Sequence, residues 1–214
     1  MIDPATVEQL LTTTRAVRRR LDLDRPVDVH VVHDCLRLAL QAPTAEGLTF
    51  GRWIIVTDPG TRQRLAEVYA RGIPAIRARA ATFEGPTKPV YTAAEWLATN
   101  LARVPVLVVP CLVVRPPADF SAVMCSTLYG SILPAVWSFQ LALRSRGLGS
   151  VFTTLHLNFE EEARAVLGIP ADVLQVALIP VAHARDGAFH AASRPAVGEV
   201  AFGNQWGRAV QETP

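Results

Sequence analysis

The chain has 214 residues, of which half are hydrophobic and 19% are charged, and its formal net charge is +2. This length is enough for one sizeable hydrophobic core and favours a single domain. The near-neutral balance gives no bulk electrostatic reason to expect nucleic acid or an anionic membrane as a partner. The first ten residues predict a capped helix rather than a signal peptide.

The three cysteines, Cys35, Cys111 and Cys125, lie in apolar surroundings and form no CxxC pair. This usage is typical of reduced core thiols in a cytosolic protein, with a structural disulfide as the less favoured alternative. We therefore expect a cytoplasmic protein.

The first third of the chain predicts three helices and a strand. Asp3 followed by Pro4 predicts a helix that ends near residue 14. An amphipathic helix follows over residues 27–43, with Val29, Val32, Leu36 and Leu40 on its apolar face. A short apolar strand is expected within 52–60. Thr61 should then cap a helix of about twenty residues, with a break near Gly72 and Pro74.

Residues 83–90 are the most loop-like stretch, and a short helix is expected over 91–101. The next stretch, PVLVVPCLVV at 105–114, is continuously apolar, which is typical of a fully buried strand. Proline has no N–H to donate to a sheet, so we expect Pro110 to interrupt the ladder.

The chain is organised around a long helix that begins at Ala122 and carries no charge before Arg144. A helix that is apolar on all sides is either a buried core helix or a membrane span. Polar residues such as Ser126, Thr127 and Gln140 would need partners in lipid, which favours the core helix. Gly147 should end it as a left-handed cap.

After this helix we expect a short strand over 150–154, a helix capped by Asn158, and a last strong strand over 174–184. Residues 185–214 form a tail too apolar to be free, and a second subunit is one surface on which it could pack. Helices outnumber the short buried strands, so the best fit is an α+β sandwich with one sheet under helices on both faces.

The arginine cluster at 15–20 is the sharpest local signal for function. Guanidinium groups bind phosphate oxygens in a bidentate fork and stabilise delocalised anions. Two alternatives stay open: a solvated basic face, and a nucleic-acid-binding module that uses Arg15–Arg20.

Other chemistries find no support in the sequence. The RGLGS stretch at 146–150 follows a helix and precedes a strand, which is the wrong order for a dinucleotide turn. His30 and His33 lack a third ligand, so no metal site is expected. No serine has the context of a nucleophile elbow. We expect no acid–base catalytic side chain.

In their order along the chain, four stretches resemble the FMN-dependent nitroreductase family, in its actinobacterial-type branch. They are the arginine segment Thr14–Val27, LALQAP at 38–43 with the strand at 53–57, PAVWSFQLALRSRGLGS at 134–150 running into FTTLHL, and LGIP at 167–170. The resemblance covers nearly the whole chain. It implies a nitroreductase-like three-layer sandwich, with a mixed, mainly antiparallel sheet flanked by helices, in a single domain over 1–214.

The resemblance further implies an intertwined homodimer in which both chains build each FMN site and the tail, 185–214, packs on the partner. The cofactor-binding residues it implies form four groups. The arginine segment takes the flavin phosphate and the N1–C2=O edge, 43–47 lie against the partner's flavin, 153–155 pass the N5 side, and a late arginine completes the phosphate site. The residues are Arg15, Ala16, Val17, Arg18, Arg19, Pro43, Thr44, Ala45, Gly47, Thr153, Thr154, Leu155 and Arg194.

The activity implied is a flavin oxidoreductase that passes hydride from NADH or NADPH through flavin N5 to a nitroaromatic, quinone or similar acceptor, by a ping-pong mechanism. One departure from the family pattern matters. Where family members carry Asn and then Gln, this chain has Glu46, Gly47, Leu48 and Thr49. The departure keeps a second reading open: a flavin-binding or sequestering paralogue with little turnover.

Overall fold

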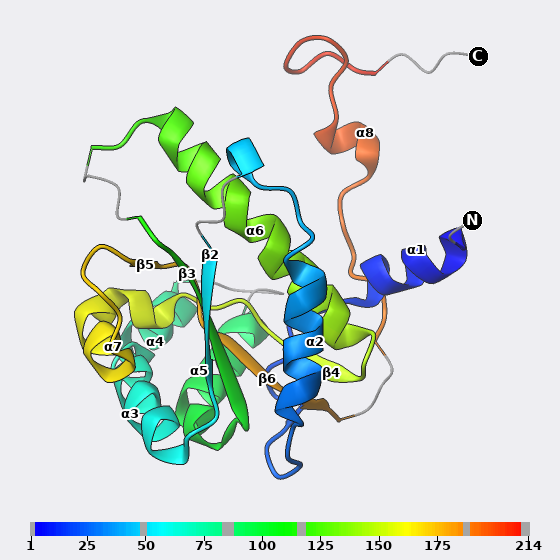
Figure 1. The fold of residues 1–214 in the computed structure, drawn as a ribbon. Helices are drawn as coiled ribbons and strands as arrows, with labels where there is room; N and C mark the ends of the chain where they lie inside the picture. Colours follow the sequence, from blue (N-terminus) through cyan, green and yellow to red (C-terminus); the bar gives the residue numbers. More distant parts are fainter. Residues whose placement is uncertain (1–2, 48–50, 83–87, 115–118, 186–188, 211–214) are drawn as a thin grey trace. The chain divides into compact units, whose positions relative to one another are not determined.

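The computed structural model describes residues 3–47, 51–82, 88–114, 119–185 and 189–210, which divide into two units (Figure 1). The larger unit comprises 14–188, and the smaller one joins the described residues of 1–13 and 189–214. Each unit is described by itself below. The single domain and the packing of the tail on a partner stay predictions.

The smaller unit contains α1 (Pro4–Thr13) and α8 (Val197–Val200). α1 begins where the sequence predicts, because the Asp3 carboxylate accepts hydrogen bonds from the backbone N–H groups of Ala5 and Thr6 at 3.2 Å. Further along, the rings of Phe202 and Trp206 pack with centroids 4.9 Å apart, yet Trp206 is 92% exposed. The tail therefore presents apolar surface to solvent.

The larger unit is built on a six-stranded sheet in the order β1-β6-β3-β2, with β4 paired to β6 and β5 paired to β3. All ladders between these strands are antiparallel. One parallel link, the isolated bridge between Ala16 and Ser150, adds to them. The strands are β1 (Leu21–Asp22), β2 (Gly51–Val56), β3 (Val106–Leu112), β4 (Leu148–Ser150), β5 (Leu174–Gln175) and β6 (Ile179–Ala184).

β3 is the central strand, and it runs through Pro110. On the β2 side the ladder is continuous, with Pro110 opposite Trp53. On the other side, β6 pairs with Val106–Val108 and β5 pairs with Cys111–Leu112, so Pro110 lies between the two ladders. The predicted interruption is thus confined to one side. There the Pro110 carbonyl still accepts a hydrogen bond from the N–H of Val176 at 2.9 Å.

Two strand predictions need correction. The strand expected over 150–154 is β4, which ends at Ser150, and Thr153 forms only an isolated bridge with Leu178. The strand expected over 174–184 is split into β5 and β6.

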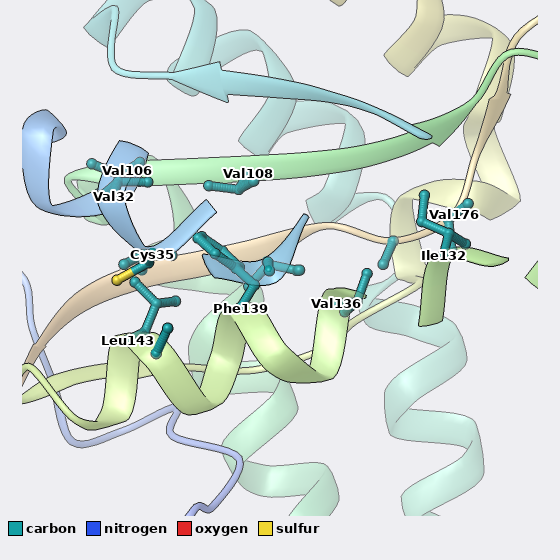
Figure 2. Packing of buried hydrophobic residues seen from close by; sticks show 14 of the residues in the cluster. Val32, Cys35, Val106, Val108, Ile132, Val136, Phe139, Leu143 and Val176 are labelled. Carbon is teal, nitrogen blue, oxygen red and sulfur yellow. The ribbon is translucent and has the colours of Figure 1, made fainter. Parts of the chain in front are cut away.

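One face of the sheet carries α2 (Val29–Ala39) and α6 (Ala122–Arg144). Figure 2 shows Cys35 of α2, Val108 of β3 and Phe139 of α6 meeting in one apolar cluster. The buried face of α2 is Val32, Cys35 and Ala39, whereas Leu40, predicted on that face, is 59% exposed because α2 ends before it. Cys35 and Cys111 are buried free thiols and Cys125 is a half-buried one, as predicted.

α6 is not buried on all sides within this chain, which corrects the sequence prediction. One of its faces packs on α2 and the sheet, but Leu133 is 38% and Trp137 is 44% exposed, and Gly130 has open space beside it. The start at Ala122 is as predicted, and the Ser121 hydroxyl caps it by accepting the N–H of Met124. Gly147 has the predicted left-handed conformation at φ +74°, but it lies two residues beyond Ser145, which is the C-cap. By length and composition α6 could also cross a membrane, a test that core helices pass as well.

In Figure 1 the remaining helices lie on the opposite side of β2 and β3 from α2 and α6. They are α3 (Pro59–Ala70), α4 (Ile73–Ala81), α5 (Lys88–Asn100) and α7 (Glu160–Leu167), with 3-10 turns η1 (Ala45–Gly47), η3 (Leu101–Arg103) and η4 (Leu155–Phe159).

Two caps differ from prediction. The carboxylate of Asp58, not Thr61, caps α3, accepting the N–H of Thr61 at 2.7 Å. Asn158 does not cap α7, because η4 intervenes and its side chain donates to the carbonyl of Leu155. The break after α3 falls at Gly72, as predicted.

Candidate functional site

A cavity of about 510 Å³ opens in the larger unit, between the helices beyond β2 and β3 and the segment after β4. Four of its lining residues were predicted as cofactor contacts. Its volume lies within the range of about 300–1,000 Å³ that is usual for small-molecule sites. The lining residues are Arg18, Tyr69, Ala75, Ile76, Arg79, Tyr91, Ala94, Phe152, Thr153, Thr154, Leu155 and Asn158.

The arginine segment reaches this cavity because it is tied to the end of β4. Val17, which is buried, donates its backbone N–H to the carbonyl of Ser150 at 2.9 Å. A Cβ on Gly149 would lie only 3.0 Å from Cγ1 of Val17, so glycine allows this close approach. The next residue, Arg18, then lines the cavity.

Thr153 is the most firmly held wall of the cavity. Its backbone N–H donates to the carbonyl of Leu178 at 3.1 Å and its carbonyl accepts from Leu178 at 2.8 Å. Its hydroxyl is hydrogen-bonded to the phenol of Tyr69, which is 2% exposed on α3. Three hydrogen bonds therefore fix the position and the rotamer of one threonine.

Leu155 begins η4 and packs on the turn between α3 and α4. A Cβ on Gly72 would lie 2.6 Å from Cδ1 and 2.7 Å from Cδ2 of Leu155, distances that real Cβ atoms essentially never show. Gly72 has an ordinary backbone conformation, so its role is to leave room for Leu155. The side chain of Asn158 stabilises η4 itself by donating to the carbonyl of Leu155 at 3.0 Å.

The described lining of the cavity is cationic and phenolic. It includes two arginines, Arg18 and Arg79, and two tyrosines, Tyr69 and Tyr91, and none of its described members is acidic. Partial burial lowers the pKa of Arg18, which the nearby Tyr69 opposes. Burial raises the pKa of Tyr69, against the effects of the Thr153 hydrogen bond and the Arg18 charge, so the phenol is neutral near pH 7.

The structure divides the arginine cluster into different roles. The side chains of Arg15, Arg18 and Arg19 form no hydrogen bond or ion pair with any described residue, and Arg18 faces the cavity. Arg20 points elsewhere, donating its Nε to the carbonyl of Arg185 at 3.4 Å beside the β1–β6 ladder. Ala16 forms the isolated parallel bridge with Ser150.

Several predicted cofactor contacts are not among the described residues that line this cavity. Pro43 and Thr44 precede η1, and Ala45 and Gly47 belong to it. The N–H of Ala45 donates to the Ser131 hydroxyl of α6 at 3.0 Å. The contact of these four residues with a partner's flavin stays a prediction. Of the departure from the family pattern, Leu48 and Thr49 lie outside the described residues.

Arg194 belongs to the smaller unit, where it is exposed and donates to the carbonyl of Ser193 at 3.1 Å. Its role in a phosphate site stays a prediction.

Sequence reasoning missed Tyr69, Arg79 and Tyr91. Tyr69 shares the buried face of α3 with Leu65 and Ala66, so nothing in its spacing separates it from a core aromatic. Arg79 is one of three arginines between 71 and 79 on neighbouring turns, and only the packing of α4 on α5 shows which of them faces the cavity.

The comparisons with known proteins agree with this architecture. The chain matches the description "Nitroreductase family" over residues 11–183. Comparison with curated protein sequences gives no match. Among solved structures, an iodotyrosine deiodinase bound to FMN and 3-iodo-L-tyrosine is similar at a TM-score of 0.69 and 20% identity, over 89% of this chain and 96% of that one.

Two bacterial structures are equally similar in fold. The FMN-dependent nitroreductase of Mycobacterium smegmatis in complex with NADPH superposes with a TM-score of 0.68 at 18% identity, over 95% of this chain and 100% of that one. A BluB-like flavoprotein from Clostridium difficile 630 gives a TM-score of 0.68 at 15% identity, over 93% and 99%. At such identities the likeness concerns the fold alone, but the family match spans most of the chain. The chain belongs to the nitroreductase family.

Proposed function

We propose that this chain is an FMN-dependent oxidoreductase that uses NADH or NADPH to reduce an electron-poor acceptor such as a nitroaromatic or a quinone. The observation that carries the proposal is the juxtaposition of Arg18 and Thr153 in one cavity, with the side chains of Arg15 and Arg19 also unpartnered among the described residues. Family membership and the FMN named in the similar structures support the choice of cofactor.

The residues present fit a flavin phosphate and ring edge. A half-buried guanidinium without a protein partner is costly unless an anion completes its hydrogen bonds. Arg18 meets this description. Arg15 directly precedes Ala16, whose bridge to Ser150 ties the arginine segment to β4. Thr153 and Thr154 add hydroxyl groups on the same side of the cavity.

When bound, the flavin would supply the redox chemistry, taking hydride from the reduced nicotinamide and passing it to the acceptor in two half-reactions. The chain's own residues bind and orient. Arg18 offers a fixed cation to negative charge on the ring edge, which costs no reorganisation during the reaction. Thr153, held by Tyr69 and Leu178, fixes the wall against which the reactants stack.

The proposal includes a homodimer in which each cavity is completed by the partner's 43–47 segment and tail. The exposed apolar face of α6 supports it, since Leu133 and Trp137 would otherwise face water. A cytoplasmic location and membership of an actinobacterial-type branch belong to the same proposal.

The visible spectrum of the purified protein, before and after addition of reduced nicotinamide, tests the proposal directly. We expect a yellow protein with flavin absorbance, bleached by NADH or NADPH without oxygen and restored by a nitroaromatic or a quinone. Colourless protein that takes up no added FMN would contradict every flavin reading.

A sequestering protein of the same fold is the second candidate, and the departure at 46–49 motivates it. Yellow protein that neither nicotinamide bleaches would support this candidate instead. The nucleic-acid reading is weakened, because Arg20 bonds to the backbone of Arg185 and so the cluster does not form one open basic face. Steep salt-dependent DNA binding would revive it.

A further inference from the structure

We propose that Tyr69 is a positioning residue for the flavin: its phenol donates to the Thr153 hydroxyl, and Thr153 donates its own proton to an acceptor atom on the edge of the bound ring. This inference rests on the proposed function and adds a residue of α3 to its site. Tyr69 lies outside the segments to which the family resemblance gives a role, so the inference depends on the geometry of the cavity.

The two hydroxyls are hydrogen-bonded to each other, and neither has a second partner among the described residues. Both residues line the cavity, but Tyr69 is 2% exposed, whereas Thr153 is partly exposed. The backbone N–H and carbonyl of Thr153 are both bonded to Leu178, which fixes the residue in place. A single bond between two O–H groups leaves one proton over, and its direction decides what the pair can do.

The direction of the bond follows from acidity and charge. A phenol, with an ordinary pKa of about 10, is more acidic than an aliphatic alcohol and is therefore the better donor. Burial raises the pKa of Tyr69 more than Thr153 and Arg18 lower it, so the phenol keeps its proton near pH 7. The nearby positive charge of Arg18 attracts the phenol oxygen and repels its proton. The Tyr69 proton therefore points to Thr153, the acceptor within reach.

This direction leaves the Thr153 hydroxyl as a donor toward the cavity. Hydrogen bonds to the ring atoms of a flavin tune its electronics when it is bound, and an acceptor on the ring edge would match this donor. Because Tyr69 orients the donor before the ligand arrives, binding is not opposed by the cost of ordering it. The charge of Arg18 polarises the phenol, and the phenol polarises the threonine hydroxyl, which strengthens the last bond in the chain. No proton is transferred along it.

A double-mutant cycle on the FMN complex tests the proposal, with Tyr69→Phe, Thr153→Val and the combined variant. Each single change removes one hydroxyl and nearly keeps the shape of the side chain. Thr153→Val should weaken FMN binding about 2- to 10-fold, as for the loss of one hydrogen bond. Tyr69→Phe should weaken it by a smaller factor, because its hydroxyl acts only through Thr153. Adding Tyr69→Phe to Thr153→Val should therefore cause no further loss in the fluorescence titration.

The visible spectrum of bound FMN is a readout that a purely structural role of Tyr69 would leave unchanged. The flavin bands should shift in the same direction in Tyr69→Phe and Thr153→Val, because both disturb a hydrogen bond to the ring. Thr153→Ser keeps the hydroxyl and should keep the wild-type bands. Tyr129→Phe is the matched control, since it removes a phenol hydroxyl from α6 outside the described lining of the cavity. Its affinity and spectrum should equal those of the wild type.

The outcomes separate this inference from the proposed function. If Tyr69→Phe binds FMN with wild-type affinity and an unshifted spectrum, the role of Tyr69 is overturned and the proposed function stands. Losses that add up in the combined variant would also overturn it, since Tyr69 would then act independently of Thr153. An equal loss in Tyr129→Phe would do the same, because the effect would not be specific to this bond. If the wild type takes up no FMN, both proposals fail.

Discussion

Arg18 is the single residue whose surroundings most clearly call for a ligand. It is partly buried, its pKa is lowered by burial, and its side chain has no hydrogen-bonding partner among the described residues. We expect Arg18→Gln to weaken FMN binding about 10- to 100-fold, because a charge-assisted hydrogen bond contributes roughly 1.5–3 kcal/mol. Arg15→Ala should act in the same direction while leaving the dimer intact. Titration of FMN into apoprotein, followed by flavin fluorescence, measures both.

The control for this prediction is Arg37→Gln, which removes one positive charge from the exposed side of α2. Its FMN affinity should match that of the wild type. An Arg18→Gln variant that binds FMN as tightly as Arg37→Gln would remove Arg18 from the site.

His156 is a second residue with a measurable consequence, this time for stability. It is fully buried in η4, neither ring nitrogen has a hydrogen-bond partner among the described residues, and burial lowers its pKa to about 4. Between that value and the ordinary pKa of about 6.5, the unfolded chain binds more protons than the folded one. Acidification across this window therefore destabilises the fold.

The expected loss from His156 is about 2 kcal/mol of unfolding free energy between pH 7 and pH 5. His156→Leu removes the titrating group and should make the pH dependence shallower by that amount, as measured by urea unfolding at the two pH values. If the unfolding free energy depends on pH equally in the two proteins, the pKa of His156 is not lowered in the folded state.

At the scale of elements, the turn between α3 and α4 controls the shape of the cavity through Gly72. Gly72→Ala would place a methyl group within van der Waals overlap of Leu155, so η4 must shift toward the cavity or α4 must move away. We expect a loss of roughly 1–3 kcal/mol of unfolding free energy, as for other overpacked sites, together with weaker FMN binding. Thermal unfolding and FMN titration measure the two effects.

The second variant in this test is the double change Gly72→Ala with Leu155→Ala, which removes the clash and should restore FMN affinity in part. Gly60→Ala, within α3, meets only ordinary contacts of 3.4 Å or more and serves as the control. If Gly72→Ala behaves like Gly60→Ala, the close packing of Leu155 on this turn does not shape the site.

Sequence patterns predicted elements better than their ends. Periodicity places α2, α6 and β3 because their apolar faces are long and regular. Caps were harder to predict: Asp58 and Thr61 lie three residues apart and either side chain could begin α3, and only the Asp58 hydrogen bond decides. The last strand is split at residues 176–178, beside Pro110 of β3. The sequence predicts that Pro110 interrupts a ladder, but it does not show which strand lies beside Pro110.

At the scale of the whole molecule, α6 presents an apolar surface that its own unit leaves exposed. Its exposed face, with Leu133 and Trp137 around Gly130, is the surface we expect the second copy to cover. Changing Leu133 and Trp137 together to glutamate would place two charges in that interface. Since burial of an unpaired charge costs several kcal/mol, dimer affinity should fall at least about 100-fold.

Sedimentation velocity measures the oligomeric state, and FMN retention should fall in parallel, because each cavity would lose the partner's 43–47 segment. Val90→Glu, on an exposed residue of α5, is the control and should stay dimeric. A double variant that sediments like the wild type would place the subunit contact elsewhere.

Only those residues of the candidate site that lie together in one stretch of the sequence could be predicted. Arg15–Arg19 and Thr153–Leu155 are contiguous stretches with a recognisable order, and the structure brings Arg18 and 153–155 into one cavity. Tyr69, Arg79 and Tyr91 come from three different helices, and their convergence depends on how α3, α4 and α5 pack. No spacing along the chain encodes that packing.

The two sides of the cavity are anchored very differently, and ligand exchange should reflect this. Thr153 is bonded in both directions to Leu178 beside the buried sheet, whereas α4 is joined to α5 through an ion pair whose arginine side chain is 67% exposed. In deuterium exchange, the amides of Thr153 and Leu178 should exchange only when the whole sheet unfolds. The amides of α4 should exchange faster, through local unfolding of that helix alone. A ligand would thus enter and leave by displacement of the α4 side, while the Thr153 side stays in place.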